Sequence, residues 1–290
     1  METVTLPSAK WSTLLPMGNK TWVGIAEGSS QVHVIEKNNA TTLIGHESGS
    51  RYGDGKLNGC FKHASFVSPS MLGVPLHGGI EHGATAGMFW VVSYGERHIR
   101  QVDMNNGIVS TIYEGKCIRA ITYAEGGFVI FKDHKDLKIF DITRLTVGSL
   151  PLLPQSMKAS EEKAERQRSR DVIFNTRHLY SRRSNRHIVI STSDSIYELT
   201  RHEGIQLIKK FAFDVADDYL DGLVVDNDDN IFFAKKASSM ICKLTPDGDV
   251  VDIISMRGVP VALEDGCLVV VHAHPESDWF CGNHASYIRL

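Results

Sequence analysis

The fold is decided by residues 223–254, which read LVVDNDDNIFFAKKASSMICKLTPDGDVVDII. Short apolar runs at 223–226, 230–234, 240–244 and 250–254 alternate with clusters of Asn, Asp, Ser and Gly. Runs of this length, rich in Val, Ile and Phe and bounded by turn residues, are typical of antiparallel strands joined by tight turns. We therefore predict that this segment forms a small antiparallel sheet.

The same order of strand, turn, strand, turn and strand returns along the whole chain, with almost no helical periodicity. Equivalent positions in the second strand of each copy are Trp22, Phe89, Phe128, Ile188, Ile231 and Leu268. Six copies at a mean spacing of about 49 residues match the repeat length of propeller blades. The sequence thus predicts an all-β chain, a six-bladed β-propeller that occupies residues 1–290 as one domain.

The last copy ends at Leu290 before a fourth strand can follow, so its sheet needs a strand from elsewhere. Residues 2–6 form a short β-prone run that is not part of any of the six repeats. We expect this N-terminal strand to pair into the last blade, which would leave no open sheet edge.

Residues 49–115 carry the most specific motif in the chain. They contain Gly53-Asp54-Gly55, then the run Ala64-Ser65-Phe66-Val67-Ser68-Pro69, the strand-like segments 99–103 and 107–111, and a terminal Gly115. This arrangement resembles an NHL repeat. The resemblance implies a propeller and a general role in binding proteins or RNA on a propeller face, because fold alone does not fix function.

Composition excludes several classes of protein. The net charge of −3 supplies no field that would attract nucleic acid or anionic lipid, and the apolar fraction of 42% is that of an ordinary globular chain. The N-terminus lacks the apolar run of a secretory signal, no stretch approaches the about 20 apolar residues of a membrane span, and the five cysteines form no C-x-x-C pair. We therefore expect a cytoplasmic protein with reduced thiols.

The segment 220–226 favours an enzymatic alternative, because Asp221-Gly222 resembles a motif of the six-bladed gluconolactonase and regucalcin type. The resemblance implies a metal-dependent lactonase or esterase with a divalent cation held by several oxygen ligands. Only Asp221 matches the family's ligands, and Arg177-His178 stands where an Asn-Gly is usual. A salt-bridged Asp in a turn is therefore the preferred interpretation, with no metal and no cofactor expected.

The last copy gathers side chains that could look like zinc ligands: His272, His274, Glu276, Cys281 and His284. Their spacing is not that of a standard zinc site, and 275–278 indicates a polar hairpin loop. Trp279 and Phe280 in the same region are candidate partner contacts, because aromatic side chains are enriched at binding hot spots. Packing against a neighbouring blade explains them equally well.

A charged insertion interrupts the blade pattern at 155–170, and its residues 160–168 predict the only sizeable helix. Over 158–186 the chain has nine basic and four acidic residues, a local balance of +5. Such a patch could attract an acidic or phosphate-bearing partner, although a solvated loop has the same composition. The candidate partner-binding residues in it are Arg166, Arg168, Arg170, Arg177, Arg182, Arg183 and Arg186.

The sequence therefore predicts a non-enzymatic scaffold that binds a protein partner through loops 75–87, 155–187 and 274–284. The alternatives are an RNA-binding propeller and a metal-dependent lactonase or esterase. Nucleic-acid binding is disfavoured, because few aromatic side chains accompany the basic residues. The sequence contains no G-x-S-x-G motif of the kind that would indicate a nucleophilic hydrolase.

Overall fold

A computed structural model of the 290-residue chain shows two compact units. One unit comprises Met1–Ile118 with Val261–Leu290, and the other comprises Arg119–Pro260. Within the described residues no helix is long and apolar enough to cross a membrane. The structure describes all residues except 10, 19–20, 27–30, 37–40, 45–58, 61–70, 74–86, 94–96, 125–126, 155–156, 158, 183–186, 201, 214–217 and 275–276.

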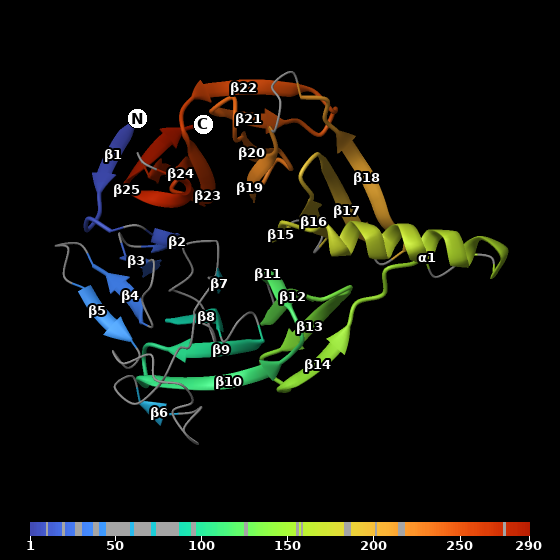
Figure 1. Ribbon diagram of the computed structural model, residues 1–290, viewed down its shortest axis with the longest axis horizontal. Helices are drawn as coiled ribbons and strands as arrows, with labels where there is room; N and C mark the ends of the chain where they lie inside the picture. Colours follow the sequence, from blue (N-terminus) through green and yellow to red (C-terminus); the bar gives the residue numbers. More distant parts are fainter. Residues whose placement is uncertain are drawn as a thin grey trace. The chain divides into compact units, whose positions relative to one another are not determined.

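The first unit holds three antiparallel blades (Figure 1). One blade consists of β2 (Trp11–Gly18), β3 (Thr21–Ala26), β4 (Val32–Ile35) and β5 (Thr41–Ile44). The next contains β6 (Gly59–Cys60), β7 (Met71–Gly73), β8 (Met88–Ser93), β9 (His98–Asp103) and β10 (Ile108–Glu114). The third joins β1 (Glu2–Thr5) to β23 (Gly258–Glu264), β24 (Cys267–His274) and β25 (Ser277–Arg289).

The second unit holds three four-stranded blades and the helix α1 (Ala159–Phe174). The first blade is β11 (Ile118–Ala124), β12 (Phe128–Asp133), β13 (Asp136–Asp141) and β14 (Thr146–Ser149). The second is β15 (His178–Ser181), β16 (Ile188–Ser191), β17 (Ser195–Thr200) and β18 (Gly204–Lys210). The third is β19 (Leu220–Val225), β20 (Ile231–Lys235), β21 (Met240–Leu244) and β22 (Val250–Ser255).

The predicted fold class, an all-β six-bladed β-propeller closed by its N-terminal strand, is confirmed. Each of the six positions chosen from the sequence lies in the second strand of its blade, from Trp22 in β3 to Leu268 in β24. The sequence pattern did not predict β2, which adds a strand to the first blade and pairs with β25 between Trp11 and Cys281. That pairing joins the first and last blades into one continuous hydrogen-bonded sheet.

Closure by the N-terminus rests on pairing and burial together. β1 runs antiparallel to β25, with Glu2 opposite Tyr287 and Thr5 opposite His284. Leu6, which follows β1, is only 4% exposed and packs in a core with Trp11 and Trp22. The strand therefore satisfies backbone groups on one side of β25 and contributes an apolar side chain to the core.

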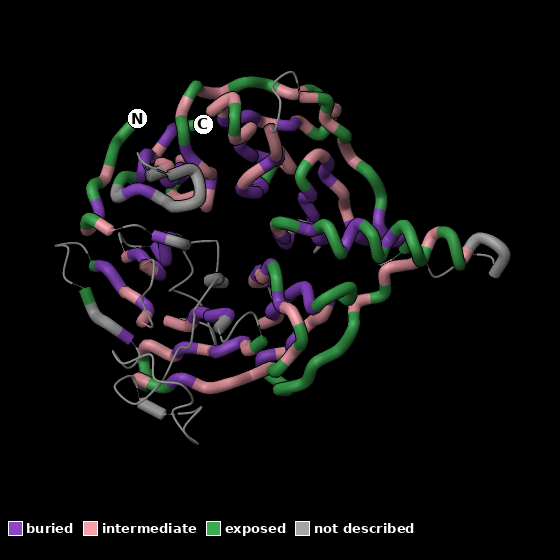
Figure 2. Tube along the Cα trace, viewed as in Figure 1, coloured by how far each residue is buried: buried purple, intermediate pink, exposed green. Residues whose placement is uncertain are grey.

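The second strands of the blades are the most buried, which explains their apolar runs. In β12 and β20 almost every residue is buried, because strands covered on both faces have no solvent side to alternate toward. β14 is exposed along its length (Figure 2). Apolar residues therefore become fewer from the buried second strand of a blade to its exposed outer strand.

Candidate functional site

The helix α1 ends at the edge of the β11–β14 blade, where a buried lysine binds its last carbonyl groups. Lys132, at the end of β12, is 4% exposed, and its Nζ donates to the carbonyl oxygens of Phe174 at 2.5 Å and Thr176 at 3.3 Å. The carbonyl groups of a helix C-terminus lack partners within the helix and carry the negative end of its dipole. Lys132 therefore fixes the point at which the helix joins the sheets.

We expect Lys132→Met to lower the free energy of unfolding by about 2 kcal/mol, because burying the carbonyl groups without a donor costs roughly 1–3 kcal/mol. Urea denaturation measures the loss. Lys135→Met is the matched control, because Lys135 is exposed and contacts only the ring of Phe174 among the interactions of the described residues. An equal loss in the two variants would contradict the capping role.

Phe174 places an aromatic ring on the surface beside these cations. The ring is about half exposed, and the Nζ atoms of Lys132 and Lys135 each lie 5.7 Å from its centroid. His134 approaches the ring edge-on, with a centroid separation of 6.4 Å. An exposed phenyl ring flanked by basic side chains combines apolar contact area with positive charge.

Arg177 extends the basic surface from the end of α1 toward β19. Its backbone N–H donates to the carbonyl oxygen of Ser191 at 2.8 Å, which anchors the residue beside β16. Its guanidinium carbon lies 4.2 Å from the ring centroid of Tyr219, a cation–π geometry. Arg177 is exposed, and within the described part of the chain no carboxylate pairs with it. The N–H donors at the edge of the guanidinium are therefore directed to solvent.

His178 begins β15 and forms a cluster with Asp221 and Lys236. Its Nε2 lies 3.0 Å from Oδ1 of Asp221, while Nζ of Lys236 lies 3.1 Å from Oδ2. The backbone N–H of Gly222 donates to the same Oδ1 at 3.0 Å. The side chain of His178 is one-third exposed, whereas that of Lys236 is 8% exposed. Asp221 thus orients the imidazole, and Lys236 balances the charge of the carboxylate.

The charge state of Asp221 follows from its partners. Burial raises the pKa of this carboxyl, but hydrogen bonds and charges from His178 and Lys236 outweigh burial and hold the pKa well below its usual range. A divalent cation at Asp221 would have to displace the Lys236 ammonium and the imidazole from both oxygens. The residues present do not fit a metal held by Asp221, and within the described residues no three His, Cys, Asp or Glu side chains gather to hold one.

The charged insertion is electrically balanced along the helix itself. Four basic and four acidic residues lie in α1, and ion pairs join Arg166 to Glu162 and Arg168 to Glu165. Arg170 is exposed. The excess of positive charge therefore comes from residues that flank the helix rather than from the helix.

Beyond the helix, the candidate arginines differ in their surroundings. Arg182 is bound at Nε by Glu198 at 3.2 Å and at Nη1 by Asp229 at 3.0 Å. Arg183 and Arg186 lie outside the described residues. Among the predicted arginines that the structure describes, Arg177 is the one that combines exposure with an aromatic platform and a neighbouring histidine.

Several sequence predictions fall on parts of the chain that the structure does not describe. These include the motif segments 53–55 and 64–69, most of loop 75–87, and the side chains of Trp279 and Phe280. In the last blade, His272 and His284 approach each other with ring centroids 6.2 Å apart, and Nε2 of His272 lies 2.8 Å from Oγ of Ser286.

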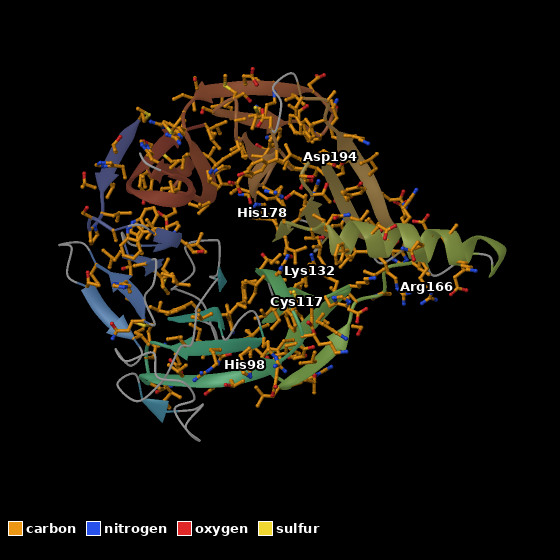
Figure 3. All side chains as sticks on the ribbon, in the orientation of Figure 1. His98, Cys117, Lys132, Arg166, His178 and Asp194 are labelled. Atoms are coloured by element: carbon orange, nitrogen blue, oxygen red, sulfur yellow. The ribbon has the colours of Figure 1, made fainter. Side chains whose placement is uncertain are left out.

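We define the α1-end surface as Phe174, Lys135, Arg177, His178 and Tyr219. Figure 3 shows Lys132 and His178 near the C-terminal end of α1, whereas Arg166 lies farther along the helix toward its N-terminal end. Only Arg177 among the five was predicted as a binding residue. Phe174 lies at the end of a helix and Tyr219 lies just before the strand that contains Asp221. These positions point to a site only once the strands have been placed in space.

Comparison with known proteins shows the fold but no family. No protein-family model and no curated protein matches the chain. A streptogramin B lyase structure aligns with a TM-score of 0.58 at 9% identity over 99% of this chain and 97% of that one. A protein of unknown function from Bacteroides thetaiotaomicron aligns at 0.60, with 15% identity over 97% of this chain and 70% of that one.

A third solved structure is an auxiliary nutrient binding protein from Bacteroides thetaiotaomicron. It aligns with a TM-score of 0.56 and 9% identity over 98% of this chain and 70% of that one. The structural neighbours thus include an enzyme and a binding protein on one fold. At such identity the likeness extends to the fold and not to the function.

Proposed function

We propose that this chain is a binding protein whose α1-end surface captures an acidic or phosphate-bearing segment of a partner protein. The observation that carries the proposal is the exposed guanidinium of Arg177, which stacks on Tyr219 without a carboxylate partner in the described residues. An arginine that is held in place by an aromatic ring presents a rigid set of donors to an anion.

The neighbouring side chains favour the same kind of ligand. Lys135 adds a second cation, and the ring of Phe174 offers apolar area beside it. Aromatic and arginine side chains at the centre of an interface contribute most of the binding energy, while surrounding charges select the partner. A protein segment with an anionic group next to an apolar residue matches both features.

The geometry of the Asp221 cluster supports binding over metal-dependent hydrolysis. Lys236 and His178 occupy the carboxylate that a lactonase-type cation would need. The balanced charges of α1 give no continuous basic stripe for RNA to follow. A cytoplasmic location agrees with Cys242 and Cys267, which form no disulfide within the described residues.

Fluorescence anisotropy with a labelled peptide tests the proposal. The peptide contains a run of glutamates with one leucine, and a matched peptide carries glutamines in their place. We expect the wild-type chain to bind the acidic peptide more tightly than the neutral one. Arg177→Glu should weaken that binding by roughly tenfold or more, since it replaces a charge-assisted contact with repulsion.

The matched control is Arg166→Glu, which reverses the same charge on the distal part of α1. Binding within about twofold of wild type is expected, because exposed charges far from the ligand are screened by salt. Equal binding of the acidic and neutral peptides, or an equal loss in the two variants, would contradict the proposal.

A further inference from the structure

One face of the last blade carries polar side chains that join the N-terminal strand to β25. Thr3 lies opposite Ser286, and their hydroxyl oxygens are 3.3 Å apart. Thr5 lies opposite His284, and its Oγ1 lies 3.4 Å from Nδ1 of the imidazole. Side chains of paired residues lie on the same face of a sheet, so both contacts hold β1 to β25 on one face.

His272 of β24 extends this polar line to the other side of β25. Its Nε2 lies 2.8 Å from Oγ of Ser286, and Ser286 is 0% exposed. Ser286 therefore contacts His272 on one neighbouring strand and Thr3 on the other. A hydroxyl can donate its one hydrogen and accept at its oxygen, so it can satisfy both contacts at once. The polar line thus runs from β24 through β25 to β1.

The two imidazoles lie close enough for their charges to interact. The ring centroids of His272 and His284 are 6.2 Å apart, and His272 is partly buried whereas His284 is exposed. Burial lowers the pKa of His272, and the charge of His284 lowers it further. Within the described residues no carboxylate opposes this shift. Protonation of both rings therefore places two like charges at the junction of three strands.

The opposite face of the same strands responds to acid in the other direction. Glu2 lies opposite Tyr287, whose hydroxyl donates to Oε2 of Glu264 at 3.1 Å. Burial raises the pKa of Glu264, hydrogen bonds from Tyr287 and the backbone of Gly18 lower it in part, and the charge of Asp265 raises it. A carboxyl whose pKa is raised favours the folded state when it is protonated, so acid does not loosen this face.

β1 is the strand that can leave this sheet at the lowest cost. It has four residues, whereas β24 pairs with β25 from Cys267 to His274. Departure of β1 opens Ser286 and the imidazole that it contacts to water, which solvates a charged ring. We propose that the pairing of β1 with β25 is an acid-sensitive clasp, which His272 and His284 release when they become protonated.

The pH dependence follows from the direction of the shift at His272. A histidine whose pKa is lowered in the closed form binds protons more tightly once β1 has left. The closed form therefore has its full stability above the ordinary histidine value of 6.5 and loses it as the pH falls through the lowered pKa of His272. A difference of about one pKa unit between the closed and open forms changes the opening equilibrium roughly tenfold.

Hydrogen–deuterium exchange of the full chain at pH 7.5 and pH 5.5 tests the clasp, with labelling times scaled to the intrinsic exchange rate at each pH. Histidine changes its charge between these values, and backbone amides of β1 are protected while the strand is paired. We expect residues 2–5 to exchange roughly tenfold faster at pH 5.5 after scaling. Fragments from β9 and β12 should exchange equally at the two pH values.

The double variant His272→Gln, His284→Gln is the most informative one. Each glutamine amide can still hydrogen-bond to a hydroxyl, but neither residue titrates. We expect residues 2–5 to exchange equally at the two pH values in this variant. His284→Gln alone changes an exposed position and removes the repulsion between the rings, so the difference should fall to about threefold.

His98→Gln is the matched control. His98 lies in β9, outside the last blade, and burial lowers its pKa as well. The roughly tenfold difference at residues 2–5 should remain in this variant. Circular dichroism at pH 7.5 checks the folding of each variant, and if the double variant does not fold, His284→Gln carries the test.

Four results would overturn the inference. They are equal exchange of residues 2–5 at the two pH values in the wild-type chain, a difference that persists in the double variant, an undiminished difference in His284→Gln, and faster exchange at pH 5.5 that is spread equally over all the blades. The last result would show general unfolding in acid rather than release of one strand.

Discussion

Replacing Gly222 with alanine should lower the free energy of unfolding by about 3 kcal/mol, the sum of a backbone cost and a packing cost. Gly222 has φ +68°, a conformation that costs an alanine roughly 1–2 kcal/mol. A Cβ there would lie 2.6 Å from the carbonyl oxygen of Pro260 and 2.7 Å from Cγ1 of Val259. The contact with the Pro260 carbonyl oxygen cannot relax without movement of the backbone, so the loss should be visible as a lower urea midpoint.

Gly248→Ala separates the two costs. Gly248 has φ +90°, but nothing lies within 4 Å of the position that its Cβ would take. We expect a loss of only about 1 kcal/mol, which is the backbone cost alone. Equal losses in Gly222→Ala and Gly248→Ala would show that β19 does not approach residues 259–260 as closely as the structure has it.

Removal of residues 1–6 should cost about 3–5 kcal/mol and expose one side of β25, because it deletes a paired strand and a buried leucine. The deletion removes the four residue pairs between β1 and β25 and the side chain of Leu6 from the core. Urea denaturation and light scattering measure the loss of stability and the aggregation that an exposed strand edge promotes.

Leu6→Ala and Glu2→Ser divide this effect. Leu6→Ala should account for roughly 2–3 kcal/mol through the cavity that it leaves, while Glu2→Ser at an exposed position should change stability by less than about 0.5 kcal/mol. A truncated chain that unfolds at the wild-type urea midpoint would contradict closure by the N-terminal strand.

The fold could be predicted from the sequence because the second strand of each blade is the most buried and therefore has the clearest apolar run. Ile188 and Ile231 lie in strands with almost no exposed residue, so their neighbours are apolar on both faces. β2 escaped prediction because Pro16 and Gly18 within Trp11–Gly18 are turn signals, and register shifts accommodate them in the observed strand.

The helix and the site could be predicted only in part. The charged run indicated a helix at 160–168, but its last turn through Phe174 has the apolar residues Val172 and Ile173, which pack into the core of the unit. A tertiary contact of this kind overrides the local signal. The helix therefore extends to the point where Lys132 binds its carbonyl groups.

The candidate site depends on contacts between residues more than 40 positions apart. Lys132 in the β11–β14 blade contacts the end of α1, and His178 contacts Asp221 in the next blade of the unit. The charge balance of residues 158–186 includes Arg182 as an unpaired positive charge. Its partners Glu198 and Asp229 lie later in the chain and were therefore not counted. Local composition identified Arg177 but could not show that Tyr219 holds it.

Hydrogen–deuterium exchange with and without a saturating acidic peptide tests most directly whether the α1-end surface is the binding site. The account predicts slower exchange in the peptic fragments that contain residues 174–181 and 219–222, with no change in β24 and β25. Slower exchange confined to β24 and β25, or no change anywhere under conditions in which the peptide binds, would contradict it.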